Sequence, residues 1–150
     1  MIRIDQLIKA YGDTTVLNIP EMNIPRGQVF GLVGNNGAGK TTLFSLLLDL
    51  IQATEGEVTI DQVNVSISED WKTNTAAFLD DSFLIGYLTP EEYFYFIGEL
   101  RKVSKKEVDE LLAGYADFFN DEILNKKKYI RDLSKGNQKK VGVVATFIGA

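Results

Sequence analysis

Residues 34–42 read GNNGAGKTT and bring glycines, one lysine and two threonines together between two apolar runs. Side chains would block phosphate oxygens, whereas glycine lets backbone N–H groups turn toward an anion and approach it closely. Lysine adds a positive charge, and a threonine hydroxyl can ligate Mg²⁺. The spacing matches G-x-x-x-x-G-K-[ST], a loop that follows a strand and opens a helix. We call residues 34–42 the glycine-rich loop and predict that it binds nucleotide phosphates; the alternative is a glycine-rich turn that fits the pattern by chance.

Each polar group of this loop has an expected role. We expect Lys40 to lie between the β- and γ-phosphates, Thr41 to ligate Mg²⁺ and Thr42 to reach the α-phosphate. Backbone N–H groups of residues 36 to 41 would surround the β-phosphate, helped by the positive end of the following helix. The predicted nucleotide-binding residues of the loop are Gly34, Asn35, Asn36, Gly37, Ala38, Gly39, Lys40, Thr41 and Thr42. Kinases, GTPases and motor ATPases share this motif, so it does not identify the family.

The composition of the chain excludes several kinds of site and partner. The chain has 150 residues, 45% of them hydrophobic, which is enough for one domain with a core of normal size. It contains no cysteine and no histidine, which excludes disulfides, thiolate metal sites and histidine acid–base catalysis. A net charge of −5 argues against nucleic acid as a partner, and the basic run at 126–128 is interpreted as a solvated or partner-facing surface. We find no signal peptide and no membrane-spanning run, so the expected location is the cytoplasm.

The first half of the chain reads mainly as strands. Short alternating runs at 2–8 and 15–19 predict two antiparallel strands, and the apolar run 28–33 predicts a strand buried on both faces of a parallel sheet. Residues 40–51 are apolar nearly all round, which predicts an enclosed helix. Further strands are predicted at 56–60, 63–65 and 75–79.

The second half reads as helical. Thr89 and Ser104 each precede a glutamate by three residues, the pattern of a capping box, and predict the starts of two helices that form a hairpin. A last helix is expected from about Ser134. Its predicted buried face carries Val141, Val144, Ala145 and Ile148.

The segment LSKGNQ at 133–138 resembles the L-S-G-G-Q signature of ATP-binding cassette (ABC) ATPases, in its L-S-K-G variant. A serine hydroxyl and a glycine N–H at a helix N-terminus can form a second anion site. The resemblance implies that this site grips the γ-phosphate of a nucleotide held by another subunit in a head-to-tail dimer. The predicted signature residues acting on the second subunit are Ser134, Lys135, Gly136, Asn137 and Gln138. The alternative is an ordinary amphipathic helix capped by serine.

The resemblance also assigns roles outside the two motifs. It implies that Tyr11 stacks on adenine and that Val16 makes an apolar contact with it, although Tyr11 can equally be a tyrosine of a turn. Asp80 stands where the family has a glutamine that contacts Mg²⁺ or the attacking water. An aspartate there would hold Mg²⁺ through water; the alternative is an ordinary loop acid.

The implied architecture is α/β, with a P-loop NTPase core and an ABC helical signature subdomain. The core would be a mixed sheet with an antiparallel N-terminal flank over residues 1–79, followed by the helical subdomain at 80–134 and the signature helix at 135–150. Only about 90 residues separate the two motifs, which excludes chromosome-maintenance ATPases with their long coiled coils. The single acidic cassette differs from translation factors, which carry two.

Family members continue into a strand that ends in Asp-Glu, and later supply a histidine; this sequence contains neither. We therefore expect a partial cassette that is incomplete at its C-terminus, with Lys40 left to stabilise transition-state charge but no general-base glutamate. Such a piece would bind ATP better than it hydrolyses it. It would also leave strand edges unpaired and apolar surface exposed.

The function implied is the ATP-binding subunit of an ABC transporter that binds ATP and Mg²⁺. Its expected partners are a second ATPase subunit, identical or not, and a transmembrane permease, which would place it peripherally on the cytoplasmic face of the membrane. The L-S-K-G variant favours export. The alternatives are a nucleotide-gated module that dimerises without turnover and a soluble ABC ATPase of cofactor assembly. The transported compound would contact the permease, so this sequence does not reveal it.

Overall fold

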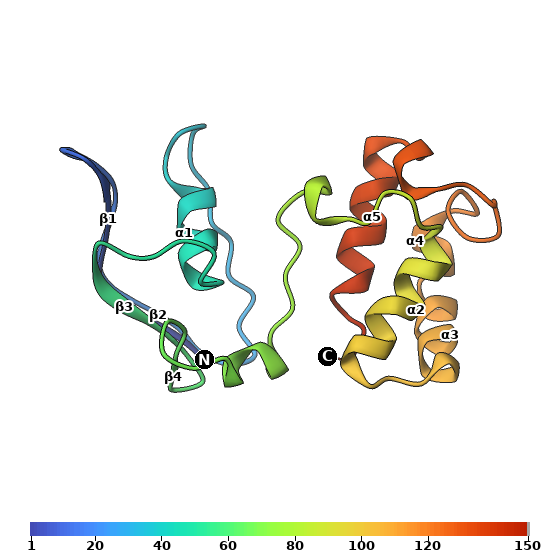
Figure 1. Ribbon diagram of the computed structural model, residues 1–150, viewed down its shortest axis with the longest axis horizontal. Helices are drawn as coiled ribbons and strands as arrows, with labels where there is room; N and C mark the ends of the chain where they lie inside the picture. Colours follow the sequence, from blue (N-terminus) through green and yellow to red (C-terminus); the bar gives the residue numbers. More distant parts are fainter. Residues whose placement is uncertain (150) are drawn as a thin grey trace. The chain divides into compact units, whose positions relative to one another are not determined.

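The computed structural model describes residues 1–149, which form two compact units (Figure 1). Unit 1 is Met1–Thr75 and contains the strands together with the glycine-rich loop. Unit 2 begins at Ala76 and contains most of the helices together with the signature segment, residues 133–138. Each unit buries its own hydrophobic cluster, so each is described by itself.

The sheet of unit 1 has four strands in the order β2-β1-β3-β4, and all neighbours are antiparallel. They are β1 (Ile2–Tyr11), β2 (Thr14–Ile24), β3 (Glu55–Ile60) and β4 (Val63–Asn64). The strands predicted at 2–8, 15–19 and 56–60 are confirmed, and the first two extend further than expected. The tight turn that joins β1 to β2 explains their antiparallel pairing.

One face of this sheet is buried and the other carries charge. Ile4 pairs with Met22 on β2 and with Val58 on β3, and it is completely buried. The neighbouring Asp5 pairs with Glu21 and Glu57, so three carboxylate residues lie abreast across three strands. The alternation follows the period of two along a strand, in which successive side chains point to opposite faces. The helix α1 (Lys40–Leu47) adds to the core. The buried cluster is Ile4, Leu7, Leu43, Leu46, Leu47, Val58, Ile60, Val65 and Trp71.

A bulge interrupts β1 where it meets β3. The register shifts between Asp5 and Ile8, and Gln6 has a positive φ of 46°. Opposite the bulge, Gly56 has a φ of 76°, and a Cβ built on it would lie 2.2 Å from the Gln6 carbonyl oxygen. Glycine is therefore required at this position both for the backbone conformation and for the close approach of β1.

Charged groups join three strands at one end of unit 1's sheet. The Asp61 carboxylate accepts hydrogen bonds from the N-terminal ammonium of Met1 at 2.6 Å and from the Arg26 guanidinium at 2.9 and 2.7 Å. The hydrogen bonds from Arg26 and the N-terminus lower the pKa of Asp61 to about 2. The same contact raises the pKa of Arg26.

Unit 2 is built from α2 (Pro90–Arg101), α3 (Lys105–Gly114), α4 (Ala116–Phe119) and α5 (Lys135–Ala145). Both predicted capping boxes are present, because Thr89 and Glu92 satisfy each other's backbone N–H groups and Ser104 and Glu107 do the same. The side-chain contribution of such caps is about 1 kcal/mol each.

The core of unit 2 gathers residues from all four helices. Phe94 and Phe119 are its largest fully buried rings, with centroids 5.9 Å apart. The predicted buried face of the last helix is confirmed. The cluster is Tyr93, Phe94, Val108, Leu112, Phe119, Ile123, Ile130, Leu133, Val141, Val144, Ala145 and Ile148.

Two of the predicted strands are absent from the part of the chain that the structure describes, so these two predictions are wrong. Segments 28–33 and 75–79 form no ladder with any strand from Met1 to Gly149. Val29 and Val33 are 99% and 95% exposed instead of buried. An apolar run forms a buried strand only when neighbours supply hydrogen bonds and cover both faces, and the sheet of unit 1 supplies neither to this segment.

The helix predicted at 40–51 is shorter and less enclosed than expected. α1 ends at Leu47, and the chain then closes a wide turn in which the Leu50 N–H donates to the Ser45 carbonyl at 2.8 Å. Asp49 has a φ of 52° within this turn. Phe44 and Leu50 are exposed, so the helix packs through one face only.

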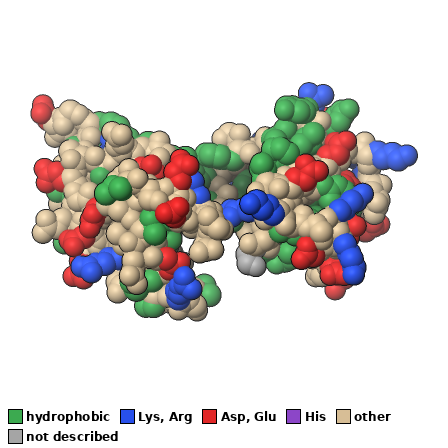
Figure 2. Space-filling model, turned by 60° about the horizontal axis from the view of Figure 1, so that its bottom comes forward, with side chains coloured by type: hydrophobic (Ala, Val, Ile, Leu, Met, Phe, Trp, Pro, Cys, Tyr) green, Lys and Arg blue, Asp and Glu red, His purple; other side chains and the backbone are tan. Residues whose placement is uncertain are grey.

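Acidic and basic side chains are interspersed on the face of both units that Figure 2 shows. Within the basic run at 126–128, Lys126 pairs with Asp121 at 3.2 Å, while Lys127 and Lys128 are exposed. Among residues 1–149, no helix combines the length and the apolar character needed to cross a bilayer.

Replacing Gly56 with alanine should destabilise unit 1 by about 3 kcal/mol or more, because the methyl group meets backbone oxygen and the positive φ is retained. Gly12→Ala is the matched control, since Gly12 has a φ of 57° but open space around it. Its cost should be only about 1 kcal/mol. Urea denaturation of both variants checks this, and equal losses would show that the collision contributes nothing.

The Asp61 contacts predict a dependence of stability on acid. The folded pKa of about 2 lies below the unfolded value of about 3.9, so the unfolded chain binds more protons between these limits. The contribution of Asp61 is complete above about pH 4 and is lost as the pH falls through about 2. Asp61→Asn should therefore flatten the stability profile in that window. Urea denaturation at several pH values measures this, and a profile that Asp61→Asn leaves unchanged would contradict the contribution of these contacts.

Candidate functional site

The glycine-rich loop folds around the side chain of Lys40. The Lys40 ammonium donates hydrogen bonds of 2.7 Å to the carbonyl oxygens of Gly34 and Asn35. The Ala38 N–H donates to the Asn35 carbonyl at 3.1 Å and tightens the turn. The loop therefore places a cation at its centre, together with the backbone that leads into α1.

Two glycines give the loop its path. Gly37 and Gly39 have φ values of 85° and 81°, a region that other residues rarely adopt. A Cβ on Gly39 would lie 2.9 Å from the Val16 carbonyl oxygen of β2. The loop therefore lies against β2 at a distance that only glycine permits, and α1 begins immediately after this contact.

The residues present fit a bound phosphate chain. The close approach at Gly39, the exposed loop backbone and the Lys40 ammonium together offer donors and positive charge at a helix N-terminus. Thr41 is exposed and Thr42 half-buried on the first turn of α1. No group of acidic side chains in residues 1–149 is arranged to bind a metal by itself. The Thr41 hydroxyl is a side-chain oxygen in the first turn of α1 that could ligate an Mg²⁺ ion bound together with the phosphates.

Tyr11 lies at the end of β1 and keeps 57% of its surface exposed. The Lys9 ammonium lies 4.7 Å from the centre of its ring and also donates to the Gln52 carbonyl at 2.8 Å. One face of the ring thus has a cation–π contact. Val16, the third residue of β2, is half-buried, and its carbonyl oxygen makes the close contact with Gly39.

Ser134 caps α5 in unit 2. Its hydroxyl oxygen accepts a hydrogen bond from the Asn137 N–H at 3.2 Å, which leaves the hydroxyl proton free to donate. Gly136 is exposed in the first turn. The Asn137 side chain donates to Glu122 at 3.1 Å. The Ser134 hydroxyl and the exposed residue Gly136 therefore occur together at the N-terminus of α5.

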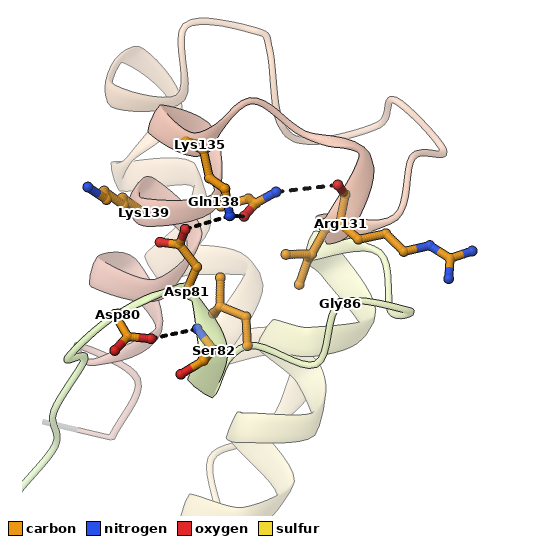
Figure 3. Close-up of a pocket in the computed structure, with 10 residues that line it drawn as sticks. Asp80, Asp81, Ser82, Gly86, Arg131, Lys135, Gln138 and Lys139 are labelled. Carbon is orange, nitrogen blue, oxygen red and sulfur yellow. Dashed lines mark hydrogen bonds and ion pairs between the residues drawn. The ribbon is translucent and has the colours of Figure 1, made fainter.

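Asp80 is used locally in the structure. Its carboxylate accepts a 2.7 Å hydrogen bond from the Ser82 N–H and caps the short helix Asp81–Phe83 (Figure 3). Hydrogen bonds from the Ser82 hydroxyl and N–H lower the pKa of Asp80. This hydrogen bond gives Asp80 a structural role that does not depend on a metal ion.

Sequence reasoning missed several polar partners of these residues. Glu122 and Asp81 bind side chains of the signature segment, and Lys9 covers Tyr11. Glu122 and Asp81 are far from their partners in sequence, so no local pattern marks them. Lys9 is two residues before Tyr11, and side chains at this spacing on a strand share a face, which is a usable signal.

A family model described as "ABC transporter" matches residues 17–150. This range contains both the glycine-rich loop and the signature segment. The chain belongs to the ABC transporter family. The resemblance inferred from the two motifs is confirmed, with ATP binding as the activity typical of the family.

Curated relatives agree with this family. The chain is 32% identical to the uncharacterized ABC transporter ATP-binding protein YhaQ of Bacillus subtilis, over 99% of this chain and 49% of the relative. It is 30% identical to the bacitracin transport ATP-binding protein BcrA of Enterococcus faecalis, over 99% and 47%. The chain therefore spans about half the length of these curated relatives.

Solved structures show the fold of this ABC domain. An ATP-binding subunit of an ABC transporter superposes with a TM-score of 0.84 at 24% identity and covers 98% of this chain and 61% of its own. A dimeric, post-hydrolysis ATP-binding cassette, MJ0796, bound to ADP and Pi, gives 0.80 at 22% identity, over 99% and 70%. The predicted P-loop α/β fold class is confirmed at this level.

Proposed function

We propose that the protein containing this ABC domain is the ATP-binding subunit of a transporter and binds Mg-ATP at the glycine-rich loop. The observation that carries this proposal is the Lys40 ammonium held at the loop's centre by two carbonyl oxygens at 2.7 Å. Phosphate oxygens are better partners for this cation than neutral carbonyls, because both charges then contribute to the hydrogen bond. Phosphate oxygens of a bound nucleotide would thus replace the carbonyl oxygens of Gly34 and Asn35 as partners of the Lys40 ammonium.

The remaining residues of unit 1 extend the site along the nucleotide. Thr41 would ligate Mg²⁺ and Thr42 the α-phosphate, while N–H groups from Asn36 onward surround the β-phosphate. Mg²⁺ would neutralise charge on the phosphates and orient them. Tyr11 would stack on adenine with the face opposite Lys9, since Lys9 already contacts one face.

We propose that the signature segment completes a site on a second ATPase subunit. Its support is the exposed N-terminus of α5, where the Ser134 hydroxyl and the Gly136 N–H can bind a γ-phosphate. A solved relative is described as a dimeric cassette bound to ADP and Pi, which is consistent with assembly in pairs. ATP would close such a head-to-tail pair, and hydrolysis would reopen it.

Hydrolysis and coupling to a permease are proposed for the whole protein, because the chain spans only about half the length of the curated relatives. Phosphoryl transfer depends on positioning and charge, so Lys40 supports binding and the transition state together. Among relatives, BcrA is described as a bacitracin transport protein and PotA of Legionella pneumophila as a spermidine/putrescine import protein. Export is therefore proposed on the L-S-K-G variant alone.

A nucleotide-gated module without turnover is the second candidate. It is favoured by Asp80, which stands in place of the family's glutamine and is held by Ser82. In that case ATP would drive dimerisation, and no phosphate would be released beyond the background rate.

Lys40→Ala should lower the affinity of the full-length protein for Mg-ATP by at least about tenfold, because the charge-assisted contacts to the phosphates are lost. Isothermal titration with Mg-ATP measures this. Lys106→Ala, which removes the same charge from the exposed surface of α3, is the control and should bind as the wild type does. Unchanged affinity in Lys40→Ala would overturn the assignment of the loop.

The shared site predicts complementation between two defective variants. Lys40→Ala keeps an intact signature, and Ser134→Ala keeps an intact glycine-rich loop. Neither full-length variant should dimerise with a non-hydrolysable ATP analogue, whereas a mixture should form dimers through the one complete site of each mixed pair. Sedimentation velocity measures the dimer fraction. A mixture that stays monomeric under conditions in which the wild type dimerises would contradict the shared site.

A further inference from the structure

A cavity of about 630 Å³ in unit 2 lies between the short helix Asp81–Phe83 and the first turns of α5 (Figure 3). The functional assignment above uses Ser134 and Gly136 at this end of α5 but does not use Lys135, which lies between them. Lys135 also occupies one of the two positions, with Asn137, at which the segment departs from the L-S-G-G-Q pattern. The contacts of Lys135 therefore indicate what a lysine does at this position of the signature segment.

Lys135 forms an ion pair across the cavity. Its ammonium donates to Asp81 Oδ2 at 2.8 Å, with side-chain exposures of 76% for Lys135 and 22% for Asp81. The other carboxylate oxygen of Asp81, Oδ1, is covered completely and has no hydrogen-bond partner in residues 1–149. A carboxylate that has lost this much water depends on its cation far more than a solvated surface acid does. The ion pair between Lys135 and Asp81 is therefore stronger than the high exposure of the Lys135 side chain alone would indicate.

A second contact carries the ion pair to the backbone beside the signature serine. The Lys135 ammonium also lies 3.3 Å from Gln138 Oε1, and Gln138 is buried. The Gln138 amide nitrogen donates to the carbonyl oxygens of Leu133 at 3.0 Å and Arg131 at 3.4 Å. We call Asp81, Lys135 and Gln138 the polar chain. It links the segment after Asp80 to the turn that immediately precedes Ser134.

The turn at the end of the polar chain is also held from its other side. The Arg131 N–H donates to the Gly86 carbonyl at 3.0 Å. The chain segments before and after the helical hairpin are thus tied together at the cavity. A change in the polar chain would move Ser134 and Gly136 without touching the glycine-rich loop, which belongs to unit 1.

We propose that Lys135 is a positioning residue: its ion pair with Asp81 fixes Ser134 and Gly136 in the orientation that grips the γ-phosphate of the partner's nucleotide. This inference rests on the proposed function of the signature segment. The Lys135 ammonium is directed at Asp81 and Gln138, so its contribution to the site is indirect. Asp81 and Lys135 act as one unit, and neither is useful without the other.

The first test needs no nucleotide. Hydrogen exchange at the amides of residues 134–138 in the full-length protein should be about fivefold faster in Lys135→Met and in Asp81→Asn than in the wild type. Lys139→Met is the matched control, because Lys139 lines the same cavity but has no ion pair in the described residues. Wild-type exchange in both Lys135→Met and Asp81→Asn would overturn the proposal.

The second test separates positioning from direct phosphate contact. In steady-state ATP hydrolysis, Lys135→Met and Asp81→Asn should each lower kcat about fivefold while the affinity of the separate subunit for Mg-ATP stays unchanged. Lys135→Arg should restore most of the rate because it keeps the pair with Asp81, and the double variant should be no slower than either single one. A slow Lys135→Met with a wild-type Asp81→Asn would mean that the lysine meets phosphate directly, which overturns the proposal.

Failure of this inference and failure of the proposed function give different results. If the wild-type protein neither binds nor hydrolyses ATP, the proposed function fails, and the exchange experiment still decides whether the polar chain orders residues 134–138. If Lys40→Ala abolishes hydrolysis while Lys135→Met and Asp81→Asn hydrolyse as the wild type does, the function stands and Lys135 has no positioning role.

Discussion

The enclosure of one ammonium group by backbone carbonyls is the interaction on which the candidate site of unit 1 depends. Lys40 folds the glycine-rich loop back over its own side chain, and Gly37 and Gly39 supply the left-handed backbone that this path requires. Gly39 then brings the start of α1 against the Val16 carbonyl of β2. The antiparallel flank is therefore part of the proposed phosphate site, because its contact with Gly39 sets where α1 begins.

The ABC domain divides its chemistry between two units with separate cores. Unit 1 holds the residues proposed to bind phosphates, and unit 2 holds the helix N-terminus proposed to act on another subunit's nucleotide. The two proposed sites share one physical principle, because each would bind phosphate through the unsatisfied N–H groups at the start of a helix. The two helix starts differ in their support: a lysine and glycines shape the first, whereas a buried glutamine and an ion pair steady the second.

Local signals in the sequence predicted most elements but not their surroundings. The capping boxes at Thr89 and Ser104, the strand alternation around Ile4 and the buried face of α5 depend on neighbours within a few residues, and all are present. The strands expected at 28–33 and 75–79 depend on distant ladder partners, which the sheet of unit 1 does not offer. The loop and signature were legible as motifs, whereas Asp81 and Glu122 were not, since tertiary packing alone brings them to α5.

Three residues with negative charge, Glu21, Asp5 and Glu57, lie side by side across three strands of the sheet. Like charges on adjacent strands repel one another, and dissolved ions weaken that repulsion over a Debye length of about 10 Å. The same ions weaken the attraction of Asp61 for Arg26 and the N-terminal ammonium. Added salt therefore weakens the repulsion among the three carboxylates and also weakens the ion pairs of Asp61. Ionic strength thus acts in opposite directions on these two parts of unit 1.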